Sequence, residues 1–330
     1  MDTNTLRLAM VGLGNQGQEH LLGMAASRHT RFVAGVDASP KQQEKTRSSY
    51  PDMEVFSSIE ELAANSQKLQ LDALVLCLPH HCYAQIWPVV TSMQLPVLKE
   101  KPLARTLDEA RLLQEQLGHK RLKTAIQRRH HPSYQHLKQL LLSDAANILE
   151  VHTWLHLGRE SGNEIKGDWR SNQSQSGGGI LLDAGYHLVD LLHFYLGSIE
   201  LINCTLWRDG KRCHAGEIDD SAQLLGRNEH CWFSLDARLG GEPDAQGKPQ
   251  KSEGIRIQTD QGLYFANRNL VEKNGQPVWQ GERDWLQAMS LQLDSFANDI
   301  RNNHWHTSTY WDHIPAMKLI ETAYQKAYQL

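Results

Sequence analysis

The sequence predicts an α/β protein with an N-terminal doubly wound parallel sheet and a C-terminal α+β domain built on a mostly antiparallel sheet. Three observations predict this fold. Short apolar runs alternate with amphipathic segments up to residue 126, a glycine-rich turn follows the first run, and the pattern changes after residue 126. Strands of a parallel sheet are apolar on both faces, whereas half-buried strands alternate between apolar and polar residues.

The N-terminal apolar runs are continuous and are bounded by turn residues, as expected for strands buried on both faces. They lie at residues 6–11, 31–36, 72–78, 96–100 and 122–127. The amphipathic segments between them include residues 15–28, 82–94 and 106–118. Because strand–helix–strand repetition is typical of a parallel sheet, we expect an N-terminal domain at residues 1–126.

The rest of the chain, residues 127–330, has a different pattern. The segment NILEVHTWLHL alternates in the manner of a half-buried strand. Further strand candidates lie at residues 199–207, 231–238, 254–259 and 262–266, and two helical patterns follow at 284–302 and 308–328. The few helices between the strands favour an antiparallel sheet, and the polar stretch 241–254 has the composition of an exposed loop.

Composition excludes several classes of protein. The 330 residues are 40% hydrophobic and 22% charged, which is an ordinary globular balance. The net charge of −4 gives no general attraction to nucleic acid or to an anionic membrane. We find neither a signal peptide nor an apolar run of the roughly 20 residues that span a bilayer. The five cysteines include no C-x-x-C pair, which predicts free thiols and a cytoplasmic location.

A glycine-rich turn follows the first predicted strand. Gly12, Gly14 and Gly17 have the spacing G-x-G-x-x-G before a predicted helix, and Asp37 ends the next strand. This context is typical of a dinucleotide site in a Rossmann fold. The glycines allow a tight turn, close approach of a pyrophosphate and close packing of helix on strand. A glycine turn without a ligand is the weaker alternative, because the strand, the helix and the acid all match.

Asp37 predicts NAD as the cofactor, with NADP as the alternative. A carboxylate at this position accepts hydrogen bonds from the adenosine ribose and repels a 2′-phosphate. Lys41 and Arg47 lie in the segment that follows and could weaken this preference. We favour the interpretation that the segment KQQEKTR is a solvated helix face.

Lys101 stands where the fifth predicted strand ends, in the sequence VLKEKP. Ligands of open parallel sheets bind beyond the carboxyl ends of the strands. Lys101 is therefore expected where a nicotinamide ring meets its substrate. A lysine beside a substrate oxygen can stabilise negative charge or transfer a proton. The alternative is that Lys101 and Pro102 form an ordinary turn.

The segment SGGGILLDAGYH places three glycines before an apolar stretch that contains Asp183 and His187. Residues four apart lie on one face of a helix, so the pair is expected to point the same way. Gly185 lies inside this helix, where glycine costs about 1 kcal/mol relative to alanine. Either close packing or the approach of another group to the backbone is expected to explain these glycines.

These motifs, in this order, resemble the glucose–fructose oxidoreductase and inositol dehydrogenase (Gfo/Idh/MocA) family, whose members share a Rossmann domain and an α/β C-terminal domain. The resemblance is carried by VGLGNQG (11–17), EKP (100–102) and SGGGILLDAGYHLVDLLHFYLG (176–197). Weaker matches are QRRHHP (127–132) and DWR (168–170). The stretch LPHHCYA departs from the family at Tyr83, where many members carry histidine, and at His80, where asparagine is common. These departures bear on the substrate class more than on the fold.

The resemblance implies an NAD(P)-dependent oxidoreductase that acts on a sugar, polyol or related hydroxyl or carbonyl compound. It implies that Lys101, Asp183 and His187 form the catalytic set. His187 would exchange a proton with the reacting oxygen, Asp183 would orient the imidazole, and Lys101 would hydrogen-bond the same oxygen. Hydride would pass between the substrate carbon and the nicotinamide ring, because the cofactor carries the redox chemistry.

The resemblance also implies the binding residues and the assembly. The residues expected to bind the cofactor are Gly12, Gly14, Asn15, Gln16, Gly17, Asp37, Pro79, His80, Glu100 and Lys101. Those expected to bind the substrate are Lys101, Arg129, Trp169, Arg170 and His187. The C-terminal domain would bind the substrate and pair subunits through a free sheet face, as a homodimer or homotetramer.

Other interpretations of the same residues stay open. The chain could reduce an imine or a tetrapyrrole-type bond, or it could be a non-enzymatic dinucleotide sensor, which Lys101 and His187 argue against. Asp183 and His187 could bind a metal, but no third ligand is clustered with them and we expect none. They could also form a purely structural polar pair. The basic segment 119–131 could contact nucleic acid, but a solvated rim or an anionic substrate subsite is favoured. The motif RRHHP with His136 could bind zinc, but no cysteine accompanies it and a surface turn is favoured.

Overall fold

The structure is a computed structural model that describes residues 5–117, 121–158, 168–282, 285–302 and 312–329. The contacts of the chain divide it into two compact units. Unit 1 comprises residues 1–103, 108–127 and 285–312, and unit 2 comprises residues 104–107, 128–284 and 313–330. Among the described helices, none has the length and apolar composition that crossing a membrane requires.

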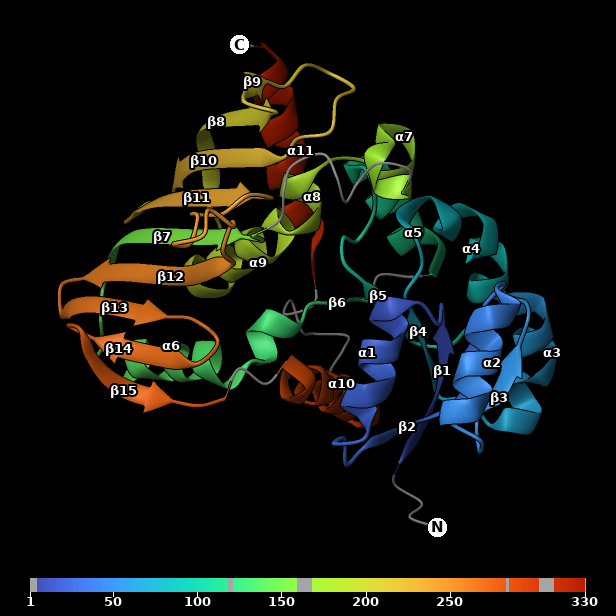
Figure 1. The fold of residues 1–330 in the computed structure, drawn as a ribbon. Coiled ribbons are helices and arrows are strands. Elements are labelled where there is room, and N and C mark those ends of the chain that lie inside the picture. Colours follow the sequence, from blue (N-terminus) through green and yellow to red (C-terminus); the bar gives the residue numbers. More distant parts are fainter. Residues whose placement is uncertain (1–4, 118–120, 159–167, 283–284, 303–311, 330) are drawn as a thin grey trace. The chain divides into compact units, whose positions relative to one another are not determined.

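Unit 1 contains a six-stranded parallel sheet in the order β3-β2-β1-β4-β5-β6, which is the Rossmann strand order. The sheet is visible in Figure 1. The strands are β1 (Leu6–Val11), β2 (Thr30–Val36), β3 (Glu54–Phe56), β4 (Ala73–Leu76), β5 (Val97–Glu100) and β6 (Leu122–Ala125). The main helices are α1 (Asn15–Met24), α2 (Pro40–Ser49), α3 (Ile59–Leu69), α4 (Tyr83–Ser92) and α5 (Leu107–Leu117). The predicted doubly wound sheet is confirmed.

All five strands predicted for the N-terminal part are present, and the sheet contains one more, β3. This edge strand has only three residues and pairs with β2 alone, so it leaves no continuous apolar run in the sequence. Strands β4, β5 and β6 are buried along their whole length. Strand β4 is apolar throughout, as expected for a strand that is buried on both faces, whereas β5 and β6 also bury the charged residues Lys99, Glu100 and Lys123.

Helix α10 (Trp285–Arg301) belongs to unit 1, although the sequence placed it in the second domain. Its residues Leu293 and Phe296 are fully buried in the same core cluster as the strands of the Rossmann sheet. A Cβ added to Gly23 of α1 would lie 2.6 Å from the Cβ of Met289, so the two helices pack closely. Figure 1 shows α1 and α10 side by side. The chain therefore returns to unit 1 after forming the sheet of unit 2.

Unit 2 contains a nine-stranded sheet in the order β15-β14-β13-β12-β7-β11-β10-β8-β9. Neighbouring strands are antiparallel except for β7 and β11, so the predicted mostly antiparallel sheet is confirmed. Its strands are β7 (Ile148–His156), β8 (Glu200–Arg208), β9 (Lys211–Arg212), β10 (Ser221–Arg227), β11 (Trp232–Arg238), β12 (Ser252–Thr259), β13 (Gly262–Ala266), β14 (Leu270–Lys273) and β15 (Gln276–Gln280).

Helices α6 (Pro132–Ser143), α8 (Ile180–Asp183), α9 (Gly185–Leu196) and α11 (Ile314–Gln329) contact the strands of this sheet. The short helix α7 (Gln173–Ser176) contacts the 3-10 turn η3 (Trp169–Ser171). Helix α9 contacts β7 and β11, and α11 contacts β8. The residues of β10 and β11 that face these helices, including Leu224, Phe233 and Leu235, are buried.

The strands β9, β10, β14 and β15 of unit 2 were not predicted from the sequence. The start of the helix predicted at 308–328 lies outside the described residues.

Candidate active site

The glycine turn joins β1 to α1 and is shaped by contacts within unit 1. Gly12 has a φ of +96°, and a Cβ there would lie 2.2 Å from the carbonyl oxygen of Cys77. A Cβ on Gly17 would lie 2.0 Å from the carbonyl oxygen of Gly12. A Cβ on Gly14, by contrast, would meet no heavy atom within 4 Å. Packing therefore requires Gly12 and Gly17, whereas open space beside Gly14 lets a pyrophosphate approach the backbone.

The start of α1 has the features of an anion site. Gly14 precedes the helix without a side-chain cap, and the first turn, which includes Asn15 and Gln16, carries no acidic residue. The Gln16 amide donates to Oε2 of Glu19 at 3.1 Å. The first N–H groups of a helix have no partner within the helix, and the helix dipole adds partial positive charge there. The turn and the helix start therefore fit the phosphates of a dinucleotide.

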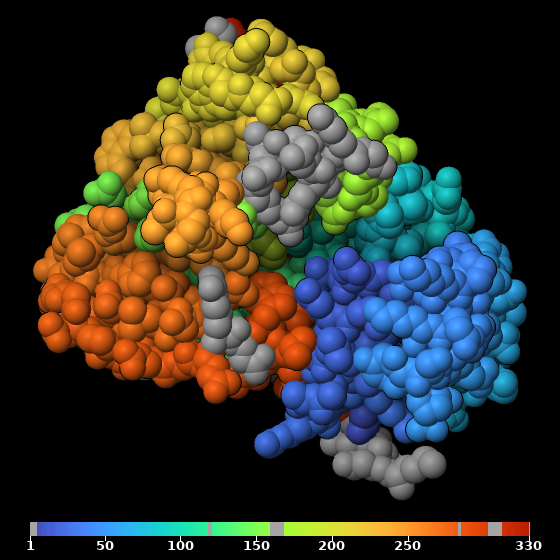
Figure 2. All heavy atoms as spheres, viewed as in Figure 1, coloured from blue at the N-terminus to red at the C-terminus, as the bar shows by residue number. Residues whose placement is uncertain are grey.

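Asp37 lies directly after β2, and two backbone N–H groups orient its carboxylate. Leu13 donates to Oδ2 at 2.8 Å and Ser39 donates to Oδ1 at 2.8 Å. The first of these bonds ties the acid to the glycine turn, as a ribose contact requires. Arg47 of α2 donates to the carbonyl oxygen of Val55 at 3.0 Å. Helix α2 is at the surface in Figures 1 and 2, and its exposed positions are polar, as predicted.

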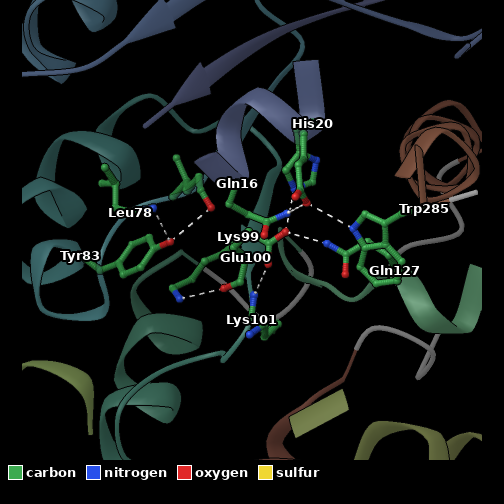
Figure 3. Close-up of polar contacts among 11 residues, drawn as sticks. Gln16, His20, Leu78, Tyr83, Lys99, Glu100, Lys101, Gln127 and Trp285 are labelled. Atoms are coloured by element: carbon green, nitrogen blue, oxygen red, sulfur yellow. Dashed lines mark hydrogen bonds and ion pairs between the residues drawn. The ribbon is translucent and has the colours of Figure 1, made fainter. Parts of the chain in front are cut away.

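Lys101 follows β5, and the peptide bond that joins it to Pro102 is cis. Its backbone N–H donates to Oε2 of Glu100 at 3.1 Å. The other carboxylate oxygen, Oε1, lies 2.8 Å from Nε2 of His20 on α1 and accepts from the Gln127 amide at 3.0 Å (Figure 3). Because Glu100 is only 6% exposed, its carboxylate serves mainly to hold the end of β5 against its neighbours.

The segment after β4 contains Pro79 and His80, at the start of the 3-10 turn η1 (His80–Cys82). Both side chains are partly exposed. Tyr83, which departs from the family pattern, is buried, and burial raises the pKa of its hydroxyl well above the ordinary value. The hydroxyl accepts from the backbone N–H of Leu78 at 3.1 Å and donates to the carbonyl of Leu76 at 3.2 Å (Figure 3). Tyr83 is thus a buried residue that packs against the end of β4 and binds its backbone.

The glycine run Gly177–Gly179 precedes α8 in unit 2 and packs against protein atoms. A Cβ on Gly178 would lie 2.2 Å from the hydroxyl of Tyr324, and one on Gly179 would lie 2.0 Å from the carbonyl oxygen of Asp219. The sequence left two explanations for these glycines, close packing or the approach of another group to the backbone. Packing inside unit 2 is sufficient to explain them.

Asp219 fixes the start of α8. Its Oδ1 accepts from the backbone N–H of Gly179 at 2.8 Å and from the hydroxyl of Tyr324 at 2.8 Å, and its Oδ2 accepts from the N–H of Leu181 at 2.8 Å. Burial raises the pKa of Asp219, while these donors act in the opposite direction. The carboxylate thus binds the N–H groups at the beginning of the helix that ends at Asp183.

Asp183 and His187 lie on two consecutive helices and not on the single helix that was expected, although Ala184 between them keeps helical φ and ψ angles of −81° and −37°. Helix α8 ends at Asp183 and α9 begins at Gly185. The N–H of His187 donates to the carbonyl of Ala184 at 3.1 Å, only three residues back, which tightens the chain at the junction. A Cβ on Gly185 would lie 3.2 Å from Cδ1 of Leu181 and 3.3 Å from the carbonyl oxygen of Ile180, which is tighter than most Cβ contacts, so packing favours glycine here. His187 is 8% exposed and Asp183 is partly exposed.

The weaker motif DWR lies beside Asp183 in unit 2. The Arg170 guanidinium lies 3.6 Å from Oδ2 of Asp183 and donates to Asp168 at 2.9 Å. Its Cζ is 4.4 Å from the centre of the Trp169 ring, which is a cation–π contact. The structure therefore brings together three of the predicted residues, namely Trp169, Arg170 and Asp183, in a half-exposed group.

Arg129, a predicted substrate residue, forms a buried ion pair. Its Nε donates to both carboxylate oxygens of Asp190, at 2.7 and 2.8 Å, and Asp190 is completely buried. Nε2 of His313 lies 3.7 Å from the same carboxylate. Arg129 is only 6% exposed, so its guanidinium is used mainly inside unit 2. These contacts favour a structural role over substrate binding.

The metal-binding alternative for Asp183 and His187 gains no support. Across the described part of the chain, the one group of three potential metal ligands is His20, Cys77 and Glu100, whose ligand atoms lie within 4.8 Å of one another. The first and last of these already share a hydrogen bond. Burial, together with the charge of Glu100, raises the pKa of Cys77 well above its ordinary value.

Several residues that organise these sites were missed. His20 lies three positions after Gly17, and Gln127 opens the QRRHHP motif, so both were adjacent to recognised motifs. Lys99 precedes Glu100, and its position in an apolar strand was the signal that it is buried. Asp190 stood in the apolar segment that continues from His187. A charged residue in such a segment indicates a buried ionic partner.

Comparison with known proteins places these features in a family. Residues 6–126 match the model of an oxidoreductase family with an NAD-binding Rossmann fold, Gfo/Idh/MocA. Residues 134–241 match the Gfo/Idh/MocA C-terminal domain. The chain belongs to the Gfo/Idh/MocA family. As a member of this family it is an NAD(P)-dependent oxidoreductase, and the glycine turn and Asp37 lie within the part of the chain that matches the NAD-binding Rossmann model.

Relatives within the Gfo/Idh/MocA family cover nearly the whole chain. An inositol 2-dehydrogenase of Arthrobacter sp. (strain FB24) is 25% identical over 94% of this chain and 90% of its own length. Two solved structures share the fold. The WlbA dehydrogenase from Bordetella pertussis, in complex with NADH and UDP-GlcNAcA, has a TM-score of 0.78 at 18% identity and covers 99% of this chain and 96% of its own. Levoglucosan dehydrogenase, in complex with NADH and levoglucosan, has a TM-score of 0.81 at 16% identity and covers 98% and 97%.

Proposed function

We propose that the protein transfers a hydride between NAD and a carbon of a sugar, polyol or related compound, with interconversion of hydroxyl and carbonyl groups. The main support is the position of Lys101 at the carboxyl end of β5, in the sheet that carries the glycine turn. Ligands of such sheets bind at this edge. Relatives named for inositol and structures named for levoglucosan favour this substrate class.

In this proposal Lys101, Asp183 and His187 act on one substrate oxygen. The bound nicotinamide supplies or accepts the hydride. His187 exchanges a proton with the reacting oxygen, Asp183 orients its imidazole, and Lys101 donates a hydrogen bond to the same oxygen. Arg170, which lies 3.6 Å from Asp183, provides positive charge that stabilises this carboxylate. Trp169 and Arg170 are the further candidates for contacting the substrate.

A panel of polyols and sugars, assayed for NADH formation, tests this proposal. We expect at least one vicinal hydroxyl compound to be oxidised, and the corresponding ketone to be reduced by NADH. Imines and tetrapyrroles are assayed in parallel with NADH and NADPH. Turnover of these compounds alone would contradict the proposed substrate class, and NAD binding without turnover of any compound would favour a sensor.

Asp37 is expected to make the protein prefer NAD over NADP. Its carboxylate, held by Leu13 and Ser39, repels a 2′-phosphate, so NAD(H) should bind at least about tenfold more tightly, which corresponds to roughly 1.4 kcal/mol. Fluorescence titration of NADH and NADPH measures both dissociation constants. Asp37→Ser should reduce the difference in affinity between NADH and NADPH. Lys68→Met, on the exposed surface of α3, should leave this difference unchanged. Equal binding of both cofactors to the parent protein would refute the prediction.

We also propose that the protein forms a homodimer or homotetramer through the sheet of unit 2. The register places Trp207, Leu225, Trp232 and Leu263 on the face opposite the helices of this unit. These four side chains are 37–50% exposed. Exposed apolar side chains on one sheet face are typical of a surface that a second subunit covers.

Light scattering after gel filtration at micromolar concentration is expected to give the mass of a dimer or tetramer. Trp232→Glu should shift the protein toward the monomer, because a charge would be buried in the interface. Leu142→Glu is the matched control, because Leu142 is a 65% exposed leucine on α6 in the same unit. A parent protein that is monomeric, or that is dissociated equally by both substitutions, would contradict this assignment.

A cytoplasmic location is proposed from the thiols. All five cysteines are free, and three of them, Cys204, Cys213 and Cys231, are buried. Burial raises the pKa of each of these three thiols, which keeps them in the unreactive protonated form. Free thiols are typical of proteins in a reducing compartment.

A further inference from the structure

Lys99 is a buried lysine two residues before Lys101. It lies in β5, is 1% exposed, and is among the largest fully buried side chains of the described residues. Lysine is almost never fully buried unless its ammonium has partners. The contacts of Lys99 therefore indicate what its burial achieves.

The Lys99 ammonium binds the backbone on both sides of Lys101. Its Nζ donates to the carbonyl oxygen of Pro102 at 2.8 Å and to that of Glu100 at 3.2 Å. Figure 3 shows the second of these bonds beside the Glu100 carboxylate. The two acceptors belong to the residues immediately before and after Lys101. One cation thus connects the two ends of a three-residue segment whose middle residue is the candidate catalytic lysine.

The aromatic ring of Tyr83 completes the environment of this ammonium. Nζ of Lys99 lies 3.7 Å from the ring centre, within the range of a cation–π contact. Two hydrogen bonds from the Tyr83 hydroxyl to the backbone around β4 hold the ring in place. Burial lowers the pKa of Lys99 to about 7, while the carboxylates of Glu109 and Glu100 act to raise it. Burial disfavours the charged form of Lys99. The presence of a lysine at this buried position therefore indicates that its hydrogen bonds are needed there.

We propose that Lys99 is a positioning residue, which fixes the backbone of residues 100–102 and thereby the place from which the Lys101 side chain reaches the substrate. The inference rests on the proposed catalytic role of Lys101. Glu100 acts on the same segment from the other side, since its carboxylate binds the N–H of Lys101. The carbonyls held by Lys99 and the N–H held by Glu100 together define the backbone around the reacting lysine. Misplacement of a reacting group by about 1 Å can cost 100-fold in rate.

Replacement of Lys99 by methionine tests the proposal, because methionine keeps most of the volume and loses all N–H donors. We expect kcat to fall roughly 10–100-fold with an almost unchanged dissociation constant for NADH. The matched control is Lys123→Met, which removes another buried lysine from the adjacent strand β6. Lys99→Gln, which retains N–H donors, should recover part of the loss and serves as the second variant if Lys99→Met folds poorly.

Two measurements separate positioning from general stability. Hydrogen exchange of a peptide that covers residues 100–104 should accelerate in Lys99→Met and not in Lys123→Met, while the other core peptides stay protected. In a double-mutant cycle, Lys99→Met should have little further effect on kcat once Lys101 is methionine, because the positioned group is then absent. Additive losses, or exchange that increases throughout unit 1, would overturn the inference.

The outcomes also distinguish this inference from the function on which it rests. Normal turnover of Lys101→Met would refute the catalytic role of Lys101, which is the part of the proposed function on which the inference rests. Reduced turnover of Lys101→Met, together with normal turnover and normal exchange in Lys99→Met, would refute only the role assigned to Lys99.

Discussion

Lys101→Met is expected to lower turnover by roughly 10²–10⁴-fold, as is typical for the loss of a positioned proton-transfer or charge-stabilising group. The affinity for NADH should stay nearly unchanged, because the glycine turn and Asp37 are the residues proposed to bind the distant adenosine part of the cofactor. Steady-state kinetics with a substrate from the polyol panel, and fluorescence titration of NADH, measure the two quantities. The control is Lys68→Met, an exposed lysine on α3 that should retain full activity.

His187→Ala should lower turnover by a factor similar to that of Lys101→Met. It should also flatten the pH dependence of kcat/KM, because the proposed proton carrier is removed. Asp183→Asn should lower turnover less than His187→Ala does if Asp183 only orients the imidazole. It should lower turnover as much if the charge of Asp183 stabilises the imidazolium. A sensor would have no turnover to lose. Near-normal turnover of Lys101→Met would mean that the lysine is only a turn residue and that the catalytic set is wrong.

Arg129→Met is expected to destabilise the protein by about 3–5 kcal/mol, since it leaves the buried carboxylate of Asp190 without its partner. Urea unfolding followed by circular dichroism measures the change in the free energy of unfolding. Replacing both partners, as in Arg129→Met with Asp190→Leu, should restore much of the loss, because no uncompensated charge is then buried.

Arg227→Met provides the comparison for Arg129→Met. Arg227 pairs with Glu200 at 2.6 Å, but both side chains are more than half exposed. Such a pair contributes about 0–1 kcal/mol, so this substitution should be nearly neutral. If Arg129→Met instead unfolded like the parent and raised KM for the substrate, the sequence-based assignment of Arg129 to substrate binding would be correct.

The parts of the fold that the sequence predicted are those with local patterns. Strands such as Ala73–Leu76 are buried along their length and therefore appear as apolar runs. The three-residue strand β3 leaves no such pattern because it pairs on one side only. The break between α8 and α9 was not foreseen, because the spacing of Asp183 and His187 fits a continuous helix. Ala184 occupies the junction, and alanine gives no sequence signal for a break.

The same distinction between local and long-range patterns applies to the candidate site. Gly12, Gly14 and Gly17 were recognisable because one short segment contains the whole requirement. The network around Glu100 joins residues 20, 100 and 127, so no local window of sequence contains it. Arg129 shows the same limit. The resemblance assigned it to substrate binding, and its ion-pair partner Asp190 is 61 residues away in the chain, beyond any local window of sequence.

The return of helix α10 to unit 1 has a consequence for biosynthesis. The ribosome makes Trp285 roughly 8–30 s after Gln127, at a rate of about 5–20 residues per second. Until then the nascent Rossmann sheet lacks Leu293 and Phe296, and the core surface that these side chains cover is open to water or to chaperones. An expression fragment that ends at residue 126 would keep that surface exposed permanently. A fragment that joins residues 1–127 to 285–312 through a short linker would be the smaller unit that can complete its own core.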